Sequence, residues 1–566
     1  MSGSEFPVQE ESKYLVDKLY NLSGAEIINT ILNLPDSETF VYNINEQDFY
    51  WIIKKIGEDE CISILELASE KQWGYVFDVE IWHKWHIDLE KTGKWLDRLM
   101  EADPVRFVKW FFKEGQSIAY YYIYKNIDLY IKEPDDEEIE FDPDFYTLEG
   151  TFFFKSRNKE NSESIDRLFK LLAREDFDRY QSILLNLNGI IPSELEEDML
   201  RMRGIRLSEY GFLPREEALS VYAPMETEFF KKKKHREIIT INNNEDIEVE
   251  EDSLFLSPIL PIKFTDNDSF FAEILSRSRR NSAEFERLSL EFAGLCNQII
   301  AADDMLDGDI NVFRKTVDKA SGYINIGFEI LCGNNFSTAT EFVRYNTLLS
   351  FFRLGFGAAL KVKWRADAWL KEGNNWFKDK NYPYSIWGER YAGILTGLSK
   401  KHPLFYSDFS EQGEEFRPFE KFAEINSCEQ ELYEVIALDN LCSMLSSGIT
   451  TIDLSPEKGT YESWLLSLWC RYKTGGKLSS SPLNDAEIKS FFKNVRKNIS
   501  NPPYKMKKEK KDFLGFFTNK VAKTEMTNIN HLEKALEKIW ISFEEETINI
   551  NTTDIDIRFL KSFEQI

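Results

Sequence analysis

The stretch from residue 34 to residue 112 places the strongest constraint on how this chain can fold. Short runs of apolar residues at helical spacing follow one another here, and each run has its own start signal. Asn45, Ser69, Asp88 and Asp103 precede such runs, where their side chains can accept hydrogen bonds from the first free backbone amides of a helix. Short amphipathic helices bury their apolar faces by stacking side by side. The stretch therefore predicts a helical stack of HEAT-like character.

The remainder of the chain also has mainly helical periodicity, so the predicted fold class is mainly α. Apolar and aromatic residues at 127–133 and 145–155 predict a short β element near residues 127–155. Helical periodicity is lost at residues 228–257, which predicts a charged linker or excursion. The expected organisation is an N-terminal tail and first helix at 1–24, a helical-stack domain at 25–227, the linker at 228–257 and a larger α-helical domain at 258–566.

Charge, hydropathy and cysteine usage narrow the class of protein. The chain has 97 Asp and Glu against 70 Lys and Arg, a formal net charge of -27. Nucleic-acid binding needs a basic face that displaces counterions, so the overall charge argues against such a partner. No run reaches the roughly 20 apolar residues of a membrane span, and residues 1–15 lack the features of a secretory signal. Six cysteines without a CxxC pair favour a reducing, cytoplasmic location. Together these observations predict a cytoplasmic protein without membrane insertion.

A metal site is one hypothesis for the segment around the WHKWHI string. The expected ligands are His83, His86, Asp78 and Glu80. The two histidines are three residues apart, which places both rings on one face if the segment is helical. The alternative is a helix junction in which the rings pack between Trp82 and Trp85. No other cofactor is predicted, and a divalent metal stays a hypothesis.

Aromatic and basic residues suggest surfaces for a protein partner. Six tryptophans fall between residues 51 and 110; most must lie in the core, but one or two exposed rings would mark a partner groove. The candidates are Trp82, Trp85 and Trp95. A second candidate surface is the basic cluster of Lys231, Lys232, Lys233 and Lys234. This cluster could hold a phosphate or an acidic partner, or it could be a solubilising patch paired with the acidic run at 245–252.

Catalytic motifs are missing from the sequence. There is no GxSxG, HExxH, phosphate-loop or dinucleotide-binding string, so no catalytic residue is assigned. Cys61 and Cys296 fall on apolar helix faces, where burial should raise the thiol pKa. Ser193 and Glu196 have the spacing of a capping box, which predicts the start of another helix.

Several strings resemble an uncharacterised family of large, mostly deltaproteobacterial proteins. They are SILELASEKQW, FDVEIW, WLDRL, YTLEGTFFF, GFLPREEALSVYAP, FFRLGFGAALKVK and FRPFEKF. The resemblance spans about residues 25–545 and implies a shared fold without an activity. The helices of about residues 30–125 are also similar to the regulatory N-domain of a bacterial magnesium transporter. The transporter's membrane part has no counterpart here, so the similarity does not imply transport.

These observations favour a cytoplasmic, non-enzymatic protein-interaction or scaffold protein, with another protein as its partner. The alternative is an enzyme or small-molecule sensor with a carboxylate-lined pocket between the two halves. A third hypothesis, a metal-responsive regulator, follows from the transporter-like helices. The sequence does not indicate an oligomeric state.

Overall fold

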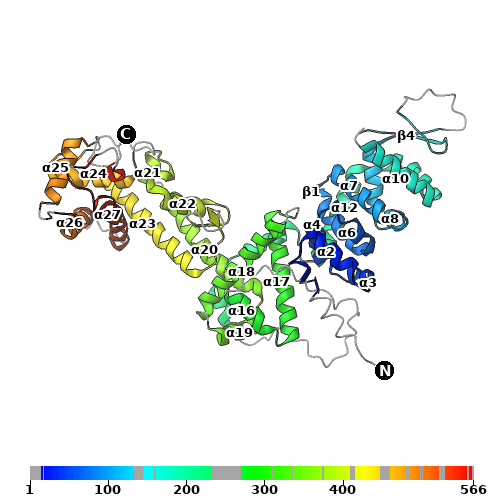
Figure 1. Cartoon of the computed structure of the whole chain (residues 1–566), viewed down its shortest axis with the longest axis horizontal. Coiled ribbons are helices and arrows are strands. Elements are labelled where there is room, and N and C mark those ends of the chain that lie inside the picture. Colours follow the sequence, from blue (N-terminus) through cyan, green and yellow to red (C-terminus); the bar gives the residue numbers. More distant parts are fainter. Residues whose placement is uncertain are drawn as a thin grey trace. The chain divides into compact units, whose positions relative to one another are not determined.

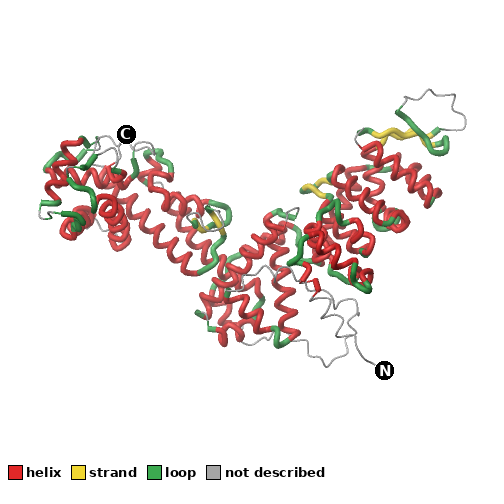
Figure 2. The backbone as a smooth tube through the Cα atoms, viewed as in Figure 1, coloured by secondary structure: helices red, strands yellow, loops and turns green. Residues whose placement is uncertain are grey.

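The computed structural model confirms that the chain is mainly α-helical (Figures 1 and 2). The structure describes residues 15–563 apart from 17, 133–143, 159–160, 233–268, 307–309, 334, 372–374, 408–414, 447–458, 480, 482, 498, 500, 522–528, 553 and 557–559. Contacts between Cα atoms divide the chain into two compact units, unit 1 (residues 1–353) and unit 2 (residues 354–566). None of the described helices is long and apolar enough to cross a membrane.

Unit 1 contains a succession of helices and two short antiparallel sheets. The helices are α2 (Gly24–Leu32), α3 (Ser37–Tyr42), α4 (Glu46–Ile56), α5 (Ile62–Leu67), α6 (Glu70–Glu80), α7 (Leu89–Ala102), α8 (Pro104–Phe111), α9 (Gln116–Asn126), α10 (Ser162–Glu175), α11 (Phe177–Asn186), η2 (Leu187–Gly189), α12 (Pro192–Glu209), α13 (Arg215–Ala218), η3 (Leu219–Tyr222), α14 (Thr227–Lys232), α16 (Phe270–Ser278), α17 (Ser282–Asp303), α18 (Ile310–Cys332) and α19 (Phe336–Tyr345). Helix α20 (Leu348–Lys371) contains the division between the units. The strands are β1 (Trp82–His83), β2 (His86–Ile87), β3 (Ile127–Ile131) and β4 (Phe152–Ser156).

The start signals predicted for residues 34–112 are confirmed. Each capping side chain accepts a hydrogen bond from the first turn of its helix: from Gln47 for Asn45, from Gln72 for Ser69, from Glu90 and Lys91 for Asp88, and from Arg106 for Asp103. These bonds satisfy amides that have no partner inside the helix, so each helix begins where its cap stands.

Arg106 shows how successive helices of unit 1 are joined. Its guanidinium donates to the carbonyl oxygens of Leu65, Glu66 and Ala68 at the C-terminal end of α5, at 2.8–3.1 Å. The same group lies 4.2 Å from the centre of the Trp73 ring. A cation at a helix C-terminus offsets the helix dipole, and the ring provides a further favourable contact. The side chain therefore links α8 to both α5 and α6.

The β element expected near residues 127–155 is present. Strands β3 and β4 pair antiparallel, with Ile127 opposite Ser156 and Ile131 opposite Phe152. The linker expected at 228–257 lies largely outside the described residues, so the domain boundary predicted there stays a prediction.

Unit 2 is also built of helices, with one pair of very short strands. After α20 come α21 (Trp376–Asp379), η5 (Tyr384–Trp387), α22 (Gly388–Ser399), β5 (Phe405–Tyr406), β6 (Phe416–Arg417), α23 (Phe422–Ser446), α24 (Tyr461–Thr474), α25 (Asp485–Val495), α26 (Lys507–Val521), α27 (Ile529–Thr547) and η7 (Lys561–Phe563). The fully buried ring of Trp469 meets Phe491, Phe513 and Trp540 edge-on, with ring centres 5.2–5.5 Å apart. This aromatic cluster joins α24, α25, α26 and α27 into one core.

Candidate functional site

The WHKWHI string forms a β-hairpin between α6 and α7. His83 and His86 are direct partners across the two strands, so Lys84 and Trp85 make the turn. The prediction that His83 and His86 share one face of a helix is therefore wrong. The two residues face each other across a turn. The backbone of Lys84 is left-handed, with φ of 56°, a conformation that suits glycine better than lysine.

The hairpin has a buried base and an exposed tip. Trp82 is 4% exposed and Ile87 is 7% exposed, and these two residues are paired at the base. The four residues from His83 to His86 are all exposed, and 53% of the Trp85 surface is accessible to solvent. Trp85 is therefore a large aromatic ring held in solvent at a defined two-residue turn.

Helix α12 holds the hairpin through Glu196. The Glu196 carboxylate accepts a hydrogen bond of 2.9 Å from the backbone amide of Ile87, and the same oxygen lies 3.6 Å from Nδ1 of His86. Burial, together with a hydrogen bond to Glu196, raises the pKa of Tyr121 on α9. The capping box predicted for Ser193 and Glu196 is wrong, because α12 begins at Pro192 and Glu196 binds the hairpin instead.

Two arginines of α12 hold α6 next to the hairpin. Arg206 donates two hydrogen bonds of 2.7 Å to the two carboxylate oxygens of Asp78. Arg203 donates from Nε to the backbone oxygen of Asp78, and its guanidinium lies 5.4 Å from the centre of the Trp82 ring. Burial raises the pKa of Asp78, and the bond to Arg206 opposes that rise. The base of the hairpin thus rests on side chains far away in the sequence.

The two carboxylates among the four proposed metal ligands form ion pairs with basic side chains. Asp78 is paired with Arg206, while Glu80 accepts from the Tyr50 hydroxyl at 2.7 Å and pairs with Lys54 at 3.0 Å. Within the part of the chain that the structure describes, no three His, Cys, Asp or Glu side chains are placed to hold a metal ion. A metal bound by all four residues would have to break two ion pairs whose carboxylates are buried. The metal site remains an untested hypothesis.

The residues proposed to bind a partner divide into buried and exposed sets. Trp82 and Trp95 are buried, whereas Trp85 is exposed. Lys231 and Lys232 end α14. Lys233 and Lys234 lie outside the described residues. Trp85 is therefore the tryptophan of the three that a partner can reach.

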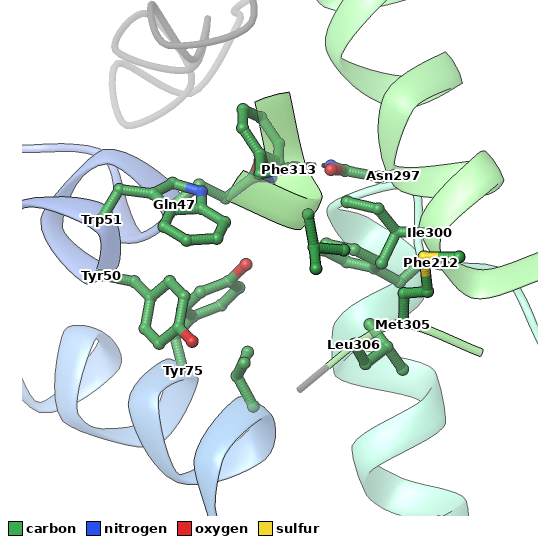
Figure 3. Close-up of a pocket in the computed structure, with 12 residues that line it drawn as sticks. Gln47, Tyr50, Trp51, Tyr75, Phe212, Asn297, Ile300, Met305, Leu306 and Phe313 are labelled. Atoms are coloured by element: carbon green, nitrogen blue, oxygen red, sulfur yellow. Dashed lines mark hydrogen bonds between the residues drawn. The ribbon is translucent and has the colours of Figure 1, made fainter. Parts of the chain in front are cut away.

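A small pocket lies between helices α4 and α6 on one side and α17 and α18 on the other (Figure 3). Its volume is about 20 Å³, room for about one water molecule. It is lined by Gln47, Tyr50, Trp51, Tyr75, Val79, Phe212, Asn297, Ile300, Met305, Leu306, Val312 and Phe313. The Asn297 amide donates to Gln47 at 3.2 Å and to the backbone oxygen of Tyr210 at 2.6 Å. Aromatic, aliphatic and amide side chains line the pocket. The pocket expected for an enzyme or sensor would instead be lined by carboxylates.

The cysteine thiols are mostly buried. All six are free, and all except the half-buried Cys332 are buried. Burial raises the pKa of Cys61 to about 12 and also raises the pKa of Cys296 well above its usual range, as predicted from their apolar faces. A thiol with such a pKa is protonated at neutral pH and reacts poorly.

Comparison with protein families assigns the chain to a family. The model of a family described as "Family of unknown function (DUF6178)" matches residues 9–564. The chain belongs to this family. No curated protein and no solved structure matches it.

In this DUF6178 chain, helix α12 has apolar residues on two faces. Met199 and Leu207 are buried together with Arg203, whereas Met202, Ile205 and the N-cap residue Ile191 are exposed. The sequence contains the signal for the exposed face, since residues 191, 195, 202 and 205 are apolar and share one side of a helix. Sequence analysis missed both this face and the role of α12 as the support of the hairpin.

Proposed function

We propose that this protein is a cytoplasmic, non-enzymatic scaffold that binds another protein through the tip of the hairpin. The observation that carries the proposal is Trp85, which is 53% exposed on a two-residue turn. Tryptophan is among the residues that contribute most to protein–protein binding, because its large ring fills a pocket on the partner.

The preorganisation of the tip supports this proposal. The turn is bounded by the buried Trp82 and Ile87 and is fastened to α12 by Glu196. A side chain on a fixed backbone loses less conformational entropy on binding than one on a flexible loop. The left-handed backbone of Lys84 costs on the order of 1–2 kcal/mol, and this cost persists only where the surrounding contacts determine the conformation.

Helix α12 extends the proposed recognition surface. Its exposed apolar side chains, Met202 and Ile205, belong to the helix that supports the hairpin, and Ile191 at its N-cap is exposed as well. Exposed apolar side chains add area that a protein partner can bury.

We also propose that the helices of unit 1 form a HEAT-like stack. Stacks of this kind present extended surfaces that commonly serve recognition. The cytoplasmic location proposed here is supported by the six free cysteines, because a reducing compartment keeps thiols unpaired.

The test is affinity purification of the tagged full-length chain from the cells that produce it. The parent, the Trp85→Ala variant and a Trp364→Ala variant are compared, since Trp364 in α20 is a similarly exposed tryptophan at 49%. We expect a partner that the parent and the control retain and that Trp85→Ala loses.

The affinity of that purified partner is then measured by calorimetry. We expect Trp85→Ala to weaken binding by about 2 kcal/mol or more, the level that defines a binding hot spot. Equal retention of every partner by the parent and Trp85→Ala would contradict the proposal.

A further inference from the structure

One part of this acidic chain carries a concentrated positive charge. Between residues 489 and 511 there are nine Lys and Arg residues and one carboxylate, Glu509. The segment includes most of α25 and the start of α26, which lie together with α24 and α27 in unit 2 (Figure 1). Seven of the nine cations are exposed lysines, which we call the lysine face: Lys489, Lys493, Lys497, Lys505, Lys507, Lys508 and Lys511.

Arg496 brings the two ends of this segment together. Its guanidinium lies 4.5 Å from the centre of the Phe492 ring on α25 and 4.3 Å from the Tyr504 ring just before α26. The same group donates to the backbone oxygens of Thr547 and Ile550, at 2.8 and 2.7 Å. Arg496 is buried, so this arrangement is part of the core. It holds the C-terminal end of α25 next to Tyr504, which precedes α26.

Nearby carboxylates are already engaged by other cations. Lys473 of α24 forms ion pairs with Glu509 at 2.7 Å and with Asp512 at 2.9 Å. Lys510 pairs with Glu537 of α27 at 3.0 Å. Among the described residues, no carboxylate forms an ion pair with a member of the lysine face. The positive charge of the lysine face is therefore available to a ligand.

The lysines at the start of α26 are unfavourable for folding. The first turn of a helix carries the positive end of the helix dipole and is stabilised by acidic residues. Lys507 and Lys508 occupy this turn together with Glu509, whose carboxylate is paired with Lys473, and Lys511 follows in the next turn. Their mutual repulsion and the dipole both act against the fold, and an anionic ligand would relieve both.

An aromatic pair joins α24 to the same helix. Tyr472 of α24 is 50% exposed, and its ring stacks on the half-buried Phe516 of α26, with ring centres 4.5 Å apart and planes at 30°. Lys520 lies 5.1 Å from the centre of the Phe516 ring. Residues 508, 512, 516 and 520 are four apart and share one row of α26, so the aromatic pair follows Lys508 along this row.

We infer that unit 2 binds single-stranded nucleic acid across the lysine face. Flexible lysines suit a phosphate backbone irrespective of sequence, and an exposed aromatic ring stacks on an unpaired base. An acidic peptide would use the lysines without the rings, so the combination favours a nucleic acid over an acidic protein. Net charge describes the whole chain and does not predict the potential at one face, which is why -27 does not exclude this partner.

The test measures binding of a labelled single-stranded oligouridylate of about 16 nucleotides, the upper end of known site sizes, to the full-length protein. Fluorescence anisotropy is recorded from about 50 to 200 mM salt, a range over which phosphate contacts weaken strongly. We expect binding at low salt that weakens as salt rises, and weaker binding of a duplex of equal length, because its bases cannot stack on Tyr472.

Two variants, each with its own control, separate the charge and stacking parts of the proposal. Lys507→Gln/Lys508→Gln/Lys511→Gln should weaken binding at least about tenfold and lower the slope of log affinity against log salt by about 2, at roughly 0.7 per lost contact. The matched control is Lys71→Gln/Lys109→Gln/Lys380→Gln, which removes the same charge at exposed lysines elsewhere. Tyr472→Ala should weaken binding about fivefold or more with an unchanged slope, and Tyr472→Phe should restore it.

Several outcomes would overturn the inference. They are no binding of the oligonucleotide at low salt, equal loss in the triple variant and its control, and equal affinity for the duplex. Equally tight binding of polyglutamate or of phosphatidylserine vesicles would also overturn it, because the surface would then select charge alone. Unchanged thermal unfolding of each variant establishes that it is folded.

Discussion

Asp78 and Arg206 form a two-bond ion pair between α6 and α12, with both hydrogen bonds at 2.7 Å. The Asp78 side chain is 8% exposed and that of Arg206 is 53% exposed, so the carboxylate is the buried partner. If the arginine is removed, the carboxylate is left buried without its main partner.

Arg206→Ala should therefore destabilise unit 1 in a pH-dependent way. The pKa of Asp78 is already raised by burial, and loss of Arg206 should raise it further. A raised native pKa means that the native state binds a proton more readily than the unfolded state, so the variant loses stability as pH rises from about 4 towards 7. We expect a cost of about 1–3 kcal/mol at pH 7 and a smaller cost near pH 4.

This cost is measured by urea unfolding at both pH values, with hydrogen exchange at α6 to locate the change. Arg201→Ala is the control, because the Arg201–Asp198 pair is exposed on the same helix and should contribute less than about 1 kcal/mol. A cost that does not change with pH would contradict the assignment to Asp78.

Asp439 should make the stability of unit 2 depend on pH. Its buried carboxylate accepts hydrogen bonds from the backbone amides of Trp376 and Phe377, both at 3.2 Å. Burial raises its pKa to about 6, and the two amide bonds only partly oppose this. Stability should thus be lost as pH rises from about 4 through 6, by on the order of 3 kcal/mol for this group.

The comparison of the parent with Asp439→Asn isolates this contribution. Asparagine does not ionise, so the variant should gain stability relative to the parent as pH rises over that range. Unfolding free energies measured at half-unit pH steps check the sign, and parallel curves for the two proteins would refute the prediction.

Gly327 should not tolerate a side chain. A Cβ at this position in α18 would overlap the backbone of Phe351 in α20. Gly327→Ala should therefore destabilise unit 1 by about 1–3 kcal/mol, because neither backbone can move without repacking. Gly294→Ala in α17 is the matched control, since its Cβ would meet no atom within 4 Å. The control should be neutral or stabilising by up to about 1 kcal/mol, and thermal unfolding of both variants tests the difference.

His83→Ala/His86→Ala should leave the metal content of the purified protein unchanged. The two rings face each other on an exposed hairpin, while Asp78 and Glu80 are held by Arg206, Tyr50 and Lys54. Elemental analysis of the parent and the double variant checks this. A transition metal that copurifies with the parent and is lost in the variant would revive the metal hypothesis.

The sequence predicted the features of the fold that are encoded locally. A cap at Asn45, Ser69, Asp88 or Asp103 acts within three residues, so the short helices were recognisable from the chain alone. The β element at 127–155 was recognised from its apolar and aromatic residues.

The candidate site depends on contacts that no local pattern encodes. Asp78 and Arg206 are 128 residues apart, and Ile87 and Glu196 are 109 residues apart. Glu196 has the spacing of a local cap and is used instead for a tertiary contact. The strands of the hairpin contain two residues each, too few for alternation to be visible, and a left-handed lysine gives no sequence signal.

The hairpin separates core packing from solvent exposure within six residues. Trp82 and Ile87 belong to the core, whereas Lys84 and Trp85 contact solvent and determine little of the packing. The turn is therefore a natural place to exchange one loop for another. Glycine at position 84 would remove the backbone strain, and a new residue at position 85 would change the exposed side chain while the buried base of the hairpin stays the same.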